Sequence, residues 1–408
     1  MAKLLQINLS ANWGSHGKIA AQIGDVAISH GWESYIAYGR ACNPCSSKLI
    51  KIGGQWDIYE HLVETRLFDN HGLASRKATK RFIKQIDEIK PDIIHLHNIH
   101  GYYLNYRILF EYLQKLSIPV VWTFHDFWAM TGHCGHFIQA NCFKWKDSCG
   151  DCPISKTEYP TSLWRDRSRK NLEEKKRLFT SVKDLTIVTV SQWVKDMVDE
   201  SFFKCIPSRV IYNGLDVDVF KPTPSDLKTE LGIPKGKPVV LGVASIWAEH
   251  RGLKHFVELS KDDSYQIVLV GVGESQRRNL PKNIITVART SNQQELAAFY
   301  TMADVYANPT YLETLSMTNI EAMACGTPVV TFRSGGAPET VDSNTGCVIE
   351  QGNTKEFHSA IVRFINEGKS KYGDNCIERV KCMFNKQDRY NDYFELYQSL
   401  LKQRNDER

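Results

Sequence analysis

The sequence lacks any apolar run that approaches the roughly 18 residues of a membrane-spanning helix. Residues 185–190 and 239–244 are apolar but have only the length of strands. Charge of one sign is also scarce, because 51 basic residues against 46 acidic ones leave a net charge of +5. Over 408 residues that excess is too small to indicate nucleic-acid binding without a focused patch. No small-residue cleavage site follows the first apolar residues, and together these absences predict a soluble, cytoplasmic protein.

Cysteine is too sparse for a disulfide scaffold, because the chain has 11 and a reducing cytosol would keep them as thiols. Their placement is uneven, however. Four of them gather within residues 134–152, namely Cys134, Cys142, Cys149 and Cys152. Hydrophobic residues make up 42% and charged residues 24%, which is ordinary for a folded chain, and the length predicts two or three domains.

Short apolar strands alternate with amphipathic helices along most of the chain, which predicts an α/β protein with parallel sheets covered on both faces. The alternation breaks at residues 131–160, which are rich in Gly, Cys, Asp and Pro. A second interruption, dense in turn formers and proline, begins at residue 213 and predicts a linker. We therefore expect a first βα domain over 1–212 with a Cys-rich insert at 131–160, a linker over 213–235, a second βα domain over 236–385, and a C-terminal helix over 386–408 that packs back on the first domain.

Two glutamates flank the expected start of a helix in the second half. With the helix beginning at about Ser316, Glu313 lies in the preceding loop and Glu321 lies inside the helix. The free N–H groups of Leu315, Ser316 and Met317 would then face a spot between the carboxylates, and a helix N-terminus favours phosphate. Carboxylates accept hydrogen bonds from hydroxyl groups, so this pattern suits a sugar nucleotide. A solvated helix with Glu near its start is the open alternative.

The spacing of Glu313 and Glu321, followed by Ala-Met-Ala-Cys-Gly-Thr-Pro-Val-Val at 322–330, resembles the signature of retaining glycosyltransferase family 4. Segments 212–222, 270–274, 296–304 and 335–339 agree with that family in order and spacing, as do Gly14 to Gly17 and His125-Asp126 in the first half. The resemblance implies the GT-B fold, in which two Rossmann-like βα domains face each other across a cleft. It also implies a donor site in the second domain and an acceptor site in the first.

The resemblance assigns roles to individual residues. Glu321 would hold the ribose hydroxyls of a nucleoside-diphosphate sugar, and Glu313 would contact the donor sugar and support charge at the anomeric carbon. N–H groups at residues 315–317 would bind the sugar or the diphosphate. Arg251 would neutralise the leaving diphosphate in place of a metal ion, so no catalytic cofactor is expected.

One stretch departs from the family's pattern. Residues 244–247 carry no positive charge where members often have a second basic residue, so Lys254, Arg289 or backbone N–H groups would take over that role. Trp247 in this stretch either packs beneath the loop or serves as a platform for sugar. Base recognition is expected from backbone groups near Val287–Thr290, and Thr290 is a predicted donor-binding residue.

The first half contributes glycines and histidines at strand ends. Gly14 and Gly17 open a helix directly after the first strand, so the backbone there can approach the donor closely. His125 follows a strand, and the resemblance gives it a catalytic or orienting role; capping of the next loop is the alternative. His95, His97 and His100 end the preceding strand and are interpreted as lining the acceptor cleft, with a metal site as the alternative.

The cysteine cluster predicts a structural zinc site. Cys149 and Cys152 form a Cys-x-x-Cys knuckle that presents two sulfurs to one ion, and Cys134 and Cys142 complete four thiolates. Bound zinc would order a long loop that has no secondary structure. His133 and His136 are possible substitute ligands, and four unconnected buried thiols are the alternative.

We therefore expect a retaining glycosyltransferase that moves a sugar from a UDP- or GDP-sugar to a glycan or lipid-linked acceptor in cell-surface polysaccharide biosynthesis. Basic residues in segments 76–90 and 162–177 suggest peripheral contact with an anionic membrane at the inner face of the cell membrane, or else merely solvated helix faces. A nucleotide-sugar epimerase of the same fold is the alternative enzyme. A zinc-knuckle nucleic-acid-binding protein is the alternative of another class, although Lys144 and Lys146 are balanced by Asp147 and Asp151, and no nucleic-acid partner is expected.

Overall fold

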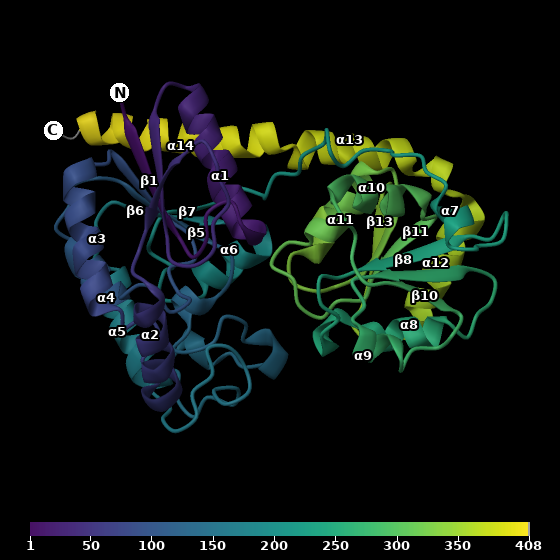
Figure 1. The fold of residues 1–408 in the computed structure, drawn as a ribbon, viewed down its shortest axis with the longest axis horizontal. Coiled ribbons are helices and arrows are strands. Elements are labelled where there is room, and N and C mark those ends of the chain that lie inside the picture. The colour runs from purple at the N-terminus through teal and green to yellow at the C-terminus, as the bar shows by residue number, and fades with distance from the viewer. Residues whose placement is uncertain (407–408) are drawn as a thin grey trace. The chain divides into compact units, whose positions relative to one another are not determined.

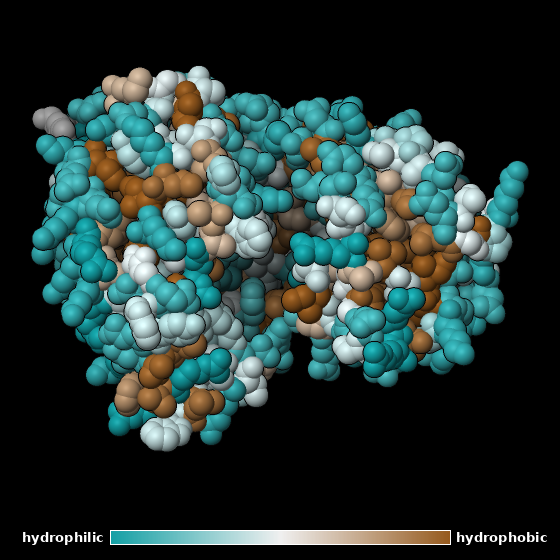
Figure 2. All heavy atoms as spheres, in the orientation of Figure 1, coloured by the Kyte–Doolittle hydropathy of each residue, from teal (hydrophilic) through white to brown (hydrophobic). Residues whose placement is uncertain are grey.

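The computed structural model describes residues 1–406, which divide into two compact units. The first unit comprises Met1–Ile211 and the C-terminal segment from Tyr390, and the second comprises Tyr212–Arg389. Within the described residues, each unit is built on one parallel sheet (Figure 1). No helix in the described part is long and apolar enough to cross a membrane. On the face seen in Figure 2, hydrophilic residues cover most of each unit and hydrophobic residues form smaller groups.

The sheet of the first unit has the strand order β3-β2-β1-β4-β5-β6-β7, and every neighbouring pair is parallel. All residues of the central strands β4, β5 and β6 are buried, as expected for strands covered on both faces. The strands are β1 (Lys3–Asn8), β2 (Glu33–Tyr38), β3 (Lys48–Lys51), β4 (Ile93–Leu96), β5 (Val120–Phe124), β6 (Leu185–Thr189) and β7 (Ser208–Val210). The helices are α1 (Gly14–Ser29), α2 (Gln55–Phe68), α3 (Arg76–Ile89), α4 (Tyr106–Leu113), α5 (Ser168–Phe179) and α6 (Gln192–Asp199).

The sheet of the second unit has the order β10-β9-β8-β11-β12-β13, again parallel throughout. Its strands are β8 (Val239–Val243), β9 (Gln266–Val270), β10 (Ile284–Val287), β11 (Val305–Asn308), β12 (Val329–Phe332) and β13 (Gly346–Ile349). Its helices are α7 (Leu227–Glu230), α8 (Leu253–Leu259), α9 (Glu274–Arg277), α10 (Gln293–Met302), α11 (Met317–Ala324), α12 (Thr354–Glu367) and α13 (Gly373–Phe384). Two parallel-sheet α/β units confirm the expected fold class.

The C-terminal helix α14 (Lys386–Asp406) contributes to the core of the first unit. Tyr390, Tyr393, Phe394 and Tyr397 belong to one buried cluster with residues of α1 and of the strands β1, β4, β5 and β6. Figure 1 shows α14 crossing α1. Residues 407–408, which the sequence assigned to this helix, lie outside the described residues.

Two other predicted segments have a defined structure. Residues 213–235, expected as a linker, lie in the second unit, where the Leu215 N–H donates to Phe384 O and Phe220 is buried. The insert 131–160 has no α-helix or strand and contains only two short 3-10 turns, Ile138–Ala140 and Lys144–Lys146.

A buried histidine ties α2 to the loop that follows it. His61 Nε2 accepts from the Gly72 N–H at 2.8 Å, and Nδ1 lies 2.9 Å from Ser75 Oγ, which in turn donates to Asp57 O. The accepting Nε2 requires a neutral ring, and burial lowers the pKa of His61 from 6.5 to about 3. The folded protein therefore keeps this ring neutral at pH values where the unfolded chain takes up a proton.

This histidine predicts a measurable loss of stability in acid. His61→Gln should be less stable than the wild type near pH 7, because hydrogen bonds are lost. Below about pH 6 the unfolded wild type binds a proton at His61, which favours unfolding, whereas the variant has no such group. The difference in unfolding free energy between wild type and variant should therefore shrink by about 1.4 kcal/mol per pH unit down to about pH 4. Urea unfolding followed by tryptophan fluorescence measures this, since eight of the nine tryptophans lie in the first unit. A difference that stays constant with pH would contradict the assignment.

Candidate functional site

The strand order of the second unit reverses between β8 and β11, and the loops that leave these strands meet at their carboxyl ends. The Tyr311 N–H donates to His250 O at 2.8 Å, which ties the loop after β11 to the loop after β8. Gly252 has a left-handed backbone with φ of 73°, and a Cβ there would lie 2.1 Å from Pro309 O. Only glycine fits this close approach, so it sets the position of the neighbouring Arg251.

Arg251 and Glu313 form an ion pair at this reversal. The Glu313 side chain is 14% exposed, and its burial raises the pKa of the carboxyl group while Arg251 opposes the rise. Arg251 is 34% exposed and can reach an incoming anion. The structure thus brings together two of the predicted site residues and places a cation beside a desolvated carboxylate.

Buried amide side chains hold the start of α11 beside this pair. Asn308 Nδ2 donates to Ser316 Oγ at 2.9 Å and to Asn319 Oδ1 at 2.8 Å, and Asn319 Nδ2 donates to Thr340 Oγ1 at 3.0 Å. Ser316 is the N-cap, so the helix begins at Met317, one residue later than expected. Leu315 and Ser316 precede the helix, and the first N–H groups of α11 have no carbonyl partner within it.

Glu321 lies on the second turn of α11, where Tyr300 of α10 donates a hydrogen bond of 2.8 Å to its carboxylate. Tyr300 is fully buried, and this contact orients one oxygen of Glu321. Tyr300 was not among the predicted site residues, although it lies in the segment 296–304 that shares the family's pattern.

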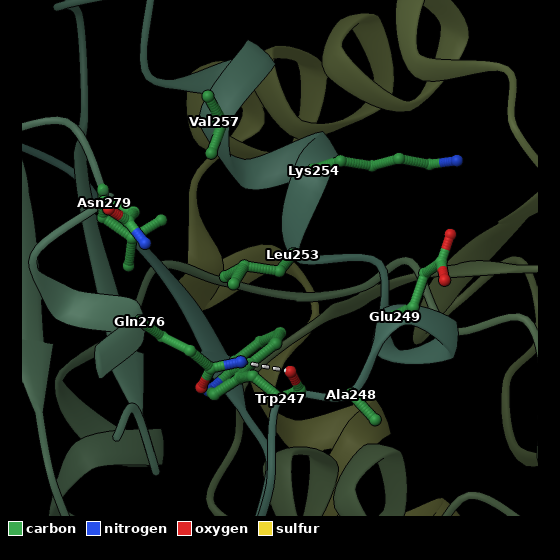
Figure 3. A pocket seen from close by; sticks show the side chains of 9 residues that line it. Trp247, Ala248, Glu249, Leu253, Lys254, Val257, Gln276 and Asn279 are labelled. Carbon is green, nitrogen blue, oxygen red and sulfur yellow. Dashed lines mark hydrogen bonds between the residues drawn. The ribbon is translucent and has the colours of Figure 1, made fainter. Parts of the chain in front are cut away.

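Other predicted residues of the second unit lie apart from this group. Thr290 follows the edge strand β10, and Arg289 beside it is exposed. Trp247 is buried, donates from Nε1 to Val270 O at 3.0 Å and packs on Phe256, so it supports the loop from below. A cavity of about 420 Å³ is lined by residues that include Trp247, Glu249, Lys254 and Gln276 (Figure 3). Arg251, Glu313 and Glu321 do not line it.

The strand order of the first unit reverses between β1 and β4, and Gly14 and Gly17 follow β1. Gly14 is the first residue of α1, has φ of 66° and has open space where a Cβ would be, so a ligand can approach it. Gly17 is buried, and a Cβ there would lie 2.7 Å from Ser10 Oγ. The second glycine is therefore required by packing inside the unit.

His125 follows β5 and shares a hydrogen bond of 3.1 Å, through Nε2, with Nδ1 of His97. Burial, followed by the charge of His16, lowers the pKa of His125 from 6.5 to about 3. Burial also lowers the pKa of His16 to about 4, and the two rings lie 6.1 Å apart. At neutral pH both imidazoles are uncharged and suited to hydrogen bonding with a ligand.

The histidines in and after β4 differ in their surroundings. His95 is fully buried, with Nδ1 2.6 Å from the hydroxyl of Tyr397 and Nε2 2.8 Å from Thr123 Oγ1. The expectation that His95 lines an acceptor cleft is therefore wrong, because its ring is buried and its two nitrogens contact Tyr397 of α14 and Thr123 of β5. His100 instead forms an ion pair with Asp126, with His100 Nε2 2.8 Å from Asp126 Oδ2. Burial raises the pKa of Asp126, but the charge and hydrogen bond of His100 lower it further, so the pKa lies below its usual value.

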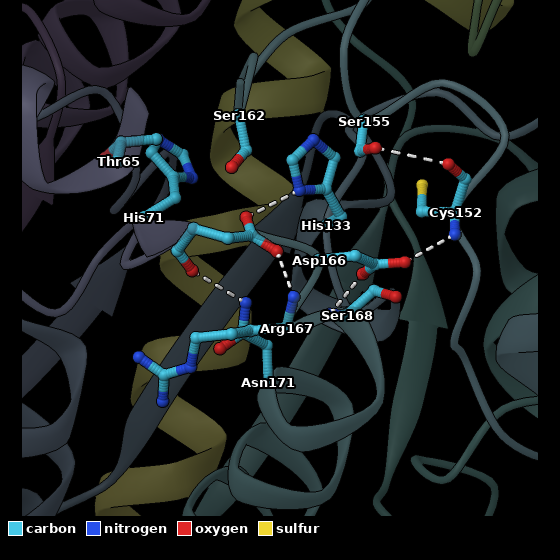
Figure 4. A network of polar contacts seen from close by, with 12 residues as sticks. Thr65, His71, His133, Cys152, Ser155, Ser162, Asp166, Arg167, Ser168 and Asn171 are labelled. Carbon is cyan, nitrogen blue, oxygen red and sulfur yellow. Dashed lines mark hydrogen bonds and ion pairs between the residues drawn. The ribbon is translucent and has the colours of Figure 1, made fainter. Parts of the chain in front are cut away.

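The four predicted zinc ligands surround one small space. Cys134, Cys142, Cys149 and Cys152 line a cavity of about 20 Å³, together with His133. Figure 4 shows His133 near Cys152, whose N–H donates to Asp166 at 2.6 Å. Among residues 1–406, no three His, Cys, Asp or Glu side chains are already placed to hold a metal ion, so the thiols share a cavity without forming a finished site.

His133, one of the two substitute ligands expected from the sequence, lies with the cysteines. Its ring is buried, Nδ1 lies 2.7 Å from Asp69 Oδ1, and Nε2 has no hydrogen-bond partner within the described residues. A carboxylate on one ring nitrogen and a vacant second nitrogen is the arrangement of a metal-binding histidine. The donor set therefore fits a thiophilic metal ion.

Comparison with known proteins covers most of the chain. The model of Glycosyltransferase Family 4 matches residues 28–219, and the model of Glycosyl transferases group 1 matches residues 225–382. A putative colanic acid biosynthesis glycosyl transferase, WcaC of Escherichia coli, is 21% identical over 97% of this chain and 100% of its own.

Solved structures agree on the fold. Sucrose-phosphate synthase of Thermosynechococcus elongatus has a TM-score of 0.73 at 20% identity over 98% of this chain and 100% of its own. HepE of Anabaena, solved with UDP, has a TM-score of 0.69 at 16% identity over the same shares of the two chains. With two parallel-sheet units and the two matching models, the chain is a glycosyltransferase family 4-like protein of the GT-B fold.

Proposed function

We propose that this glycosyltransferase moves a sugar from a UDP- or GDP-sugar to a glycan or lipid-linked acceptor, in cell-surface polysaccharide biosynthesis and with retention of the anomeric configuration. The observation that carries the proposal is the pairing of Arg251 with Glu313 where the strand order reverses, beside the N-terminus of α11. A cation, free N–H groups and carboxylates at one strand reversal match the parts of a nucleotide sugar. HepE was solved with UDP and with UDP-glucose, and WcaC is named for colanic acid biosynthesis; both support this class of donor and pathway.

The charges at the site give each residue a task. The leaving diphosphate accepts hydrogen bonds from the Arg251 guanidinium. This positive charge neutralises the diphosphate in place of a metal ion. Glu313 then turns its carboxylate to the sugar hydroxyls and to the positive charge that develops at the anomeric carbon. Glu321, oriented by Tyr300, accepts from the ribose hydroxyls.

Retention follows from attack on the face of the sugar that the diphosphate leaves. The acceptor oxygen bonds to the anomeric carbon as the bond to the phosphate oxygen breaks, and the acceptor proton passes to that phosphate. His125 accepts a hydrogen bond from a substrate hydroxyl at neutral pH. A nucleotide-sugar epimerase would change the donor without any acceptor, so product analysis with and without acceptor separates the two activities.

The donor site predicts selective binding of a nucleoside diphosphate. UDP or GDP should raise the melting temperature of the protein, since a ligand at about 100 times its Kd adds roughly 2.7 kcal/mol. Glu321→Gln should weaken that binding by about 10- to 100-fold, because charge-assisted hydrogen bonds to ribose are lost. Glu350→Gln, at an exposed carboxylate paired with Arg333, is the matched control. Equal affinity in Glu321→Gln and wild type would overturn the donor assignment.

We also propose that the insert binds one structural zinc ion through Cys134, Cys142, Cys149 and Cys152, with His133 as the fifth available ligand. The shared cavity and the vacant His133 Nε2 support it. Lys175 is buried, donates to Trp128 O and Thr131 O, and lies near enough to Cys149 and Cys134 to interact with their charge. Burial lowers the pKa of Lys175 to about 7 and raises the pKa of Cys134 and Cys149, so zinc would bind as these thiols give up their protons.

Elemental analysis tests the zinc proposal. The purified protein should contain about one zinc per chain, and Cys149→Ser with Cys152→Ser should lose the metal and lower the melting temperature. Cys205→Ser changes an exposed cysteine outside the insert and should leave both values unchanged. A metal-free preparation with the full melting temperature and full activity would rule the site out.

We further propose that an exposed apolar face of the first unit rests on an anionic membrane. Trp56, Tyr59 and Val63 lie on one side of α2 and are 84%, 51% and 54% exposed. Trp164 is 80% exposed on a loop held to the end of α2 by the Leu163 N–H donating to Arg66 O. Arg165 over the Phe68 ring adds positive charge, and aromatic residues with arginine suit the headgroup region.

Sedimentation with vesicles tests this surface. The protein should bind vesicles of phosphatidylglycerol and phosphatidylcholine at low salt, less so at high salt, and Trp56→Ala with Trp164→Ala should reduce binding several-fold. Ile246→Ser removes an exposed apolar residue of the second unit and should not change it. Failure of the wild type to bind anionic vesicles would remove the membrane proposal.

A further inference from the structure

A chain of buried side chains leads from the first strand to His125. It begins at Gln6 of β1, which is fully buried. Gln6 Nε2 donates to Ala20 O at 2.7 Å, and Oε1 lies 3.0 Å from His97 Nε2. The opposite amide orientation would set Oε1 against the Ala20 carbonyl, two acceptors with no proton between them. The orientation of this amide is therefore determined, and Oε1 is the acceptor for His97.

The amide decides which nitrogen of His97 carries the proton. Since Gln6 Oε1 can only accept, His97 Nε2 must donate. His97 is 1% exposed, and burial holds its pKa well below 6.5, so the ring is neutral and carries one proton. Its Nδ1 is then the acceptor in the 3.1 Å contact with His125 Nε2.

The protonation of His97 in turn determines which nitrogen of His125 carries the proton. Because His97 Nδ1 accepts, His125 Nε2 donates, and a neutral His125 has its lone pair on Nδ1. We infer that Gln6 and His97 are positioning residues that keep His125 in the Nε2–H tautomer, so that Nδ1 accepts a hydrogen bond from a hydroxyl group of the substrate. The role toward substrate rests on the proposed function, whereas the tautomer does not.

A second imidazole, that of His16, is oriented in the same way by Asn8 at the end of β1. Asn8 Nδ2 donates to Ser10 O and His16 O, so Asn8 Oδ1 is the acceptor for His16 Nδ1 at 3.0 Å. The neutral His16 ring then has its lone pair on Nε2. His16 and His125 are both half-buried, 6.1 Å apart, and each offers an acceptor nitrogen. A pair of neighbouring rings that each offer an acceptor nitrogen favours a ligand that donates hydrogen bonds, as a sugar with adjacent hydroxyl groups does.

Nitrogen NMR of the full-length protein labelled with ¹⁵N-histidine tests the tautomer directly. The His125 signals, identified by their loss in His125→Gln, should show a protonated Nε2 and an unprotonated Nδ1 at pH 7. Gln6→Met keeps the side-chain length but removes the acceptor, so the His97 and His125 signals should move toward a mixture of tautomers. Gln22→Leu, on α1 outside this chain of hydrogen bonds, is the control and should leave the signals unchanged.

Kinetics then tests the role of the tautomer. With the UDP- or GDP-sugar that the protein consumes, Gln6→Met should lower kcat by about tenfold or more with little change in the KM for donor. If His125 of the wild type carries its proton on Nδ1, the proposed chain of hydrogen bonds from Gln6 through His97 is wrong, whether or not the protein transfers sugar. This test uses the wild type alone, so it does not depend on the folding of Gln6→Met. If His125 carries its proton on Nε2 but the protein transfers no sugar, the proposed function is refuted and the tautomer assignment is retained. Unchanged kcat in a Gln6→Met protein with mixed tautomers would overturn the role toward substrate.

Discussion

One topological constraint underlies both units: every strand is parallel, and the strand order of each sheet reverses once. At the reversal the connections leave toward opposite faces, so the carboxyl ends of the two central strands stay open to a ligand. Arg251 and Glu313 follow β8 and β11 at one reversal, and Gly14 follows β1 at the other. The polar groups of the candidate site therefore lie where the fold itself leaves them uncovered.

Desolvation decides the state of the polar groups around these openings. Glu313 is mostly buried, and its pKa would rise further without the guanidinium of Arg251. His16 and His125 stay neutral because burial outweighs every favourable charge near them. Buried amides orient polar groups of the candidate site: Asn308 holds the start of α11, and Gln6 orients His97. A buried amide whose oxygen and nitrogen are both hydrogen-bonded has one allowed orientation, so it determines whether its partner donates or accepts.

Sequence reasoning found the residues whose signal is local and missed those whose partners are distant. Glu313, Glu321 and Arg251 lie in short patterns, and the four cysteines cluster within one segment. Tyr300 and Gln6 carry no such pattern, because Tyr300 meets Glu321 across 21 positions and Gln6 meets His97 across 91. His95 looked like its neighbour His97, yet Tyr397, 302 positions away, takes it into the core. The helix α2 was not predicted at all, since Trp56, Tyr59 and Val63 are exposed and leave no buried apolar stripe.

The sequence by itself determined the alternation of strands and helices, and hence two parallel sheets, because hydrophobic periodicity is written along the chain. It also determined where carboxylates, thiols and glycines stand in the loops. Only the tertiary structure decided which of these groups meet: that Arg251 faces Glu313, that Gly17 serves packing, and that His133 shares a cavity with the cysteines. Protonation states and hydrogen-bond directions depend on burial and on partners far apart in the chain, and these exist only once the strands are side by side.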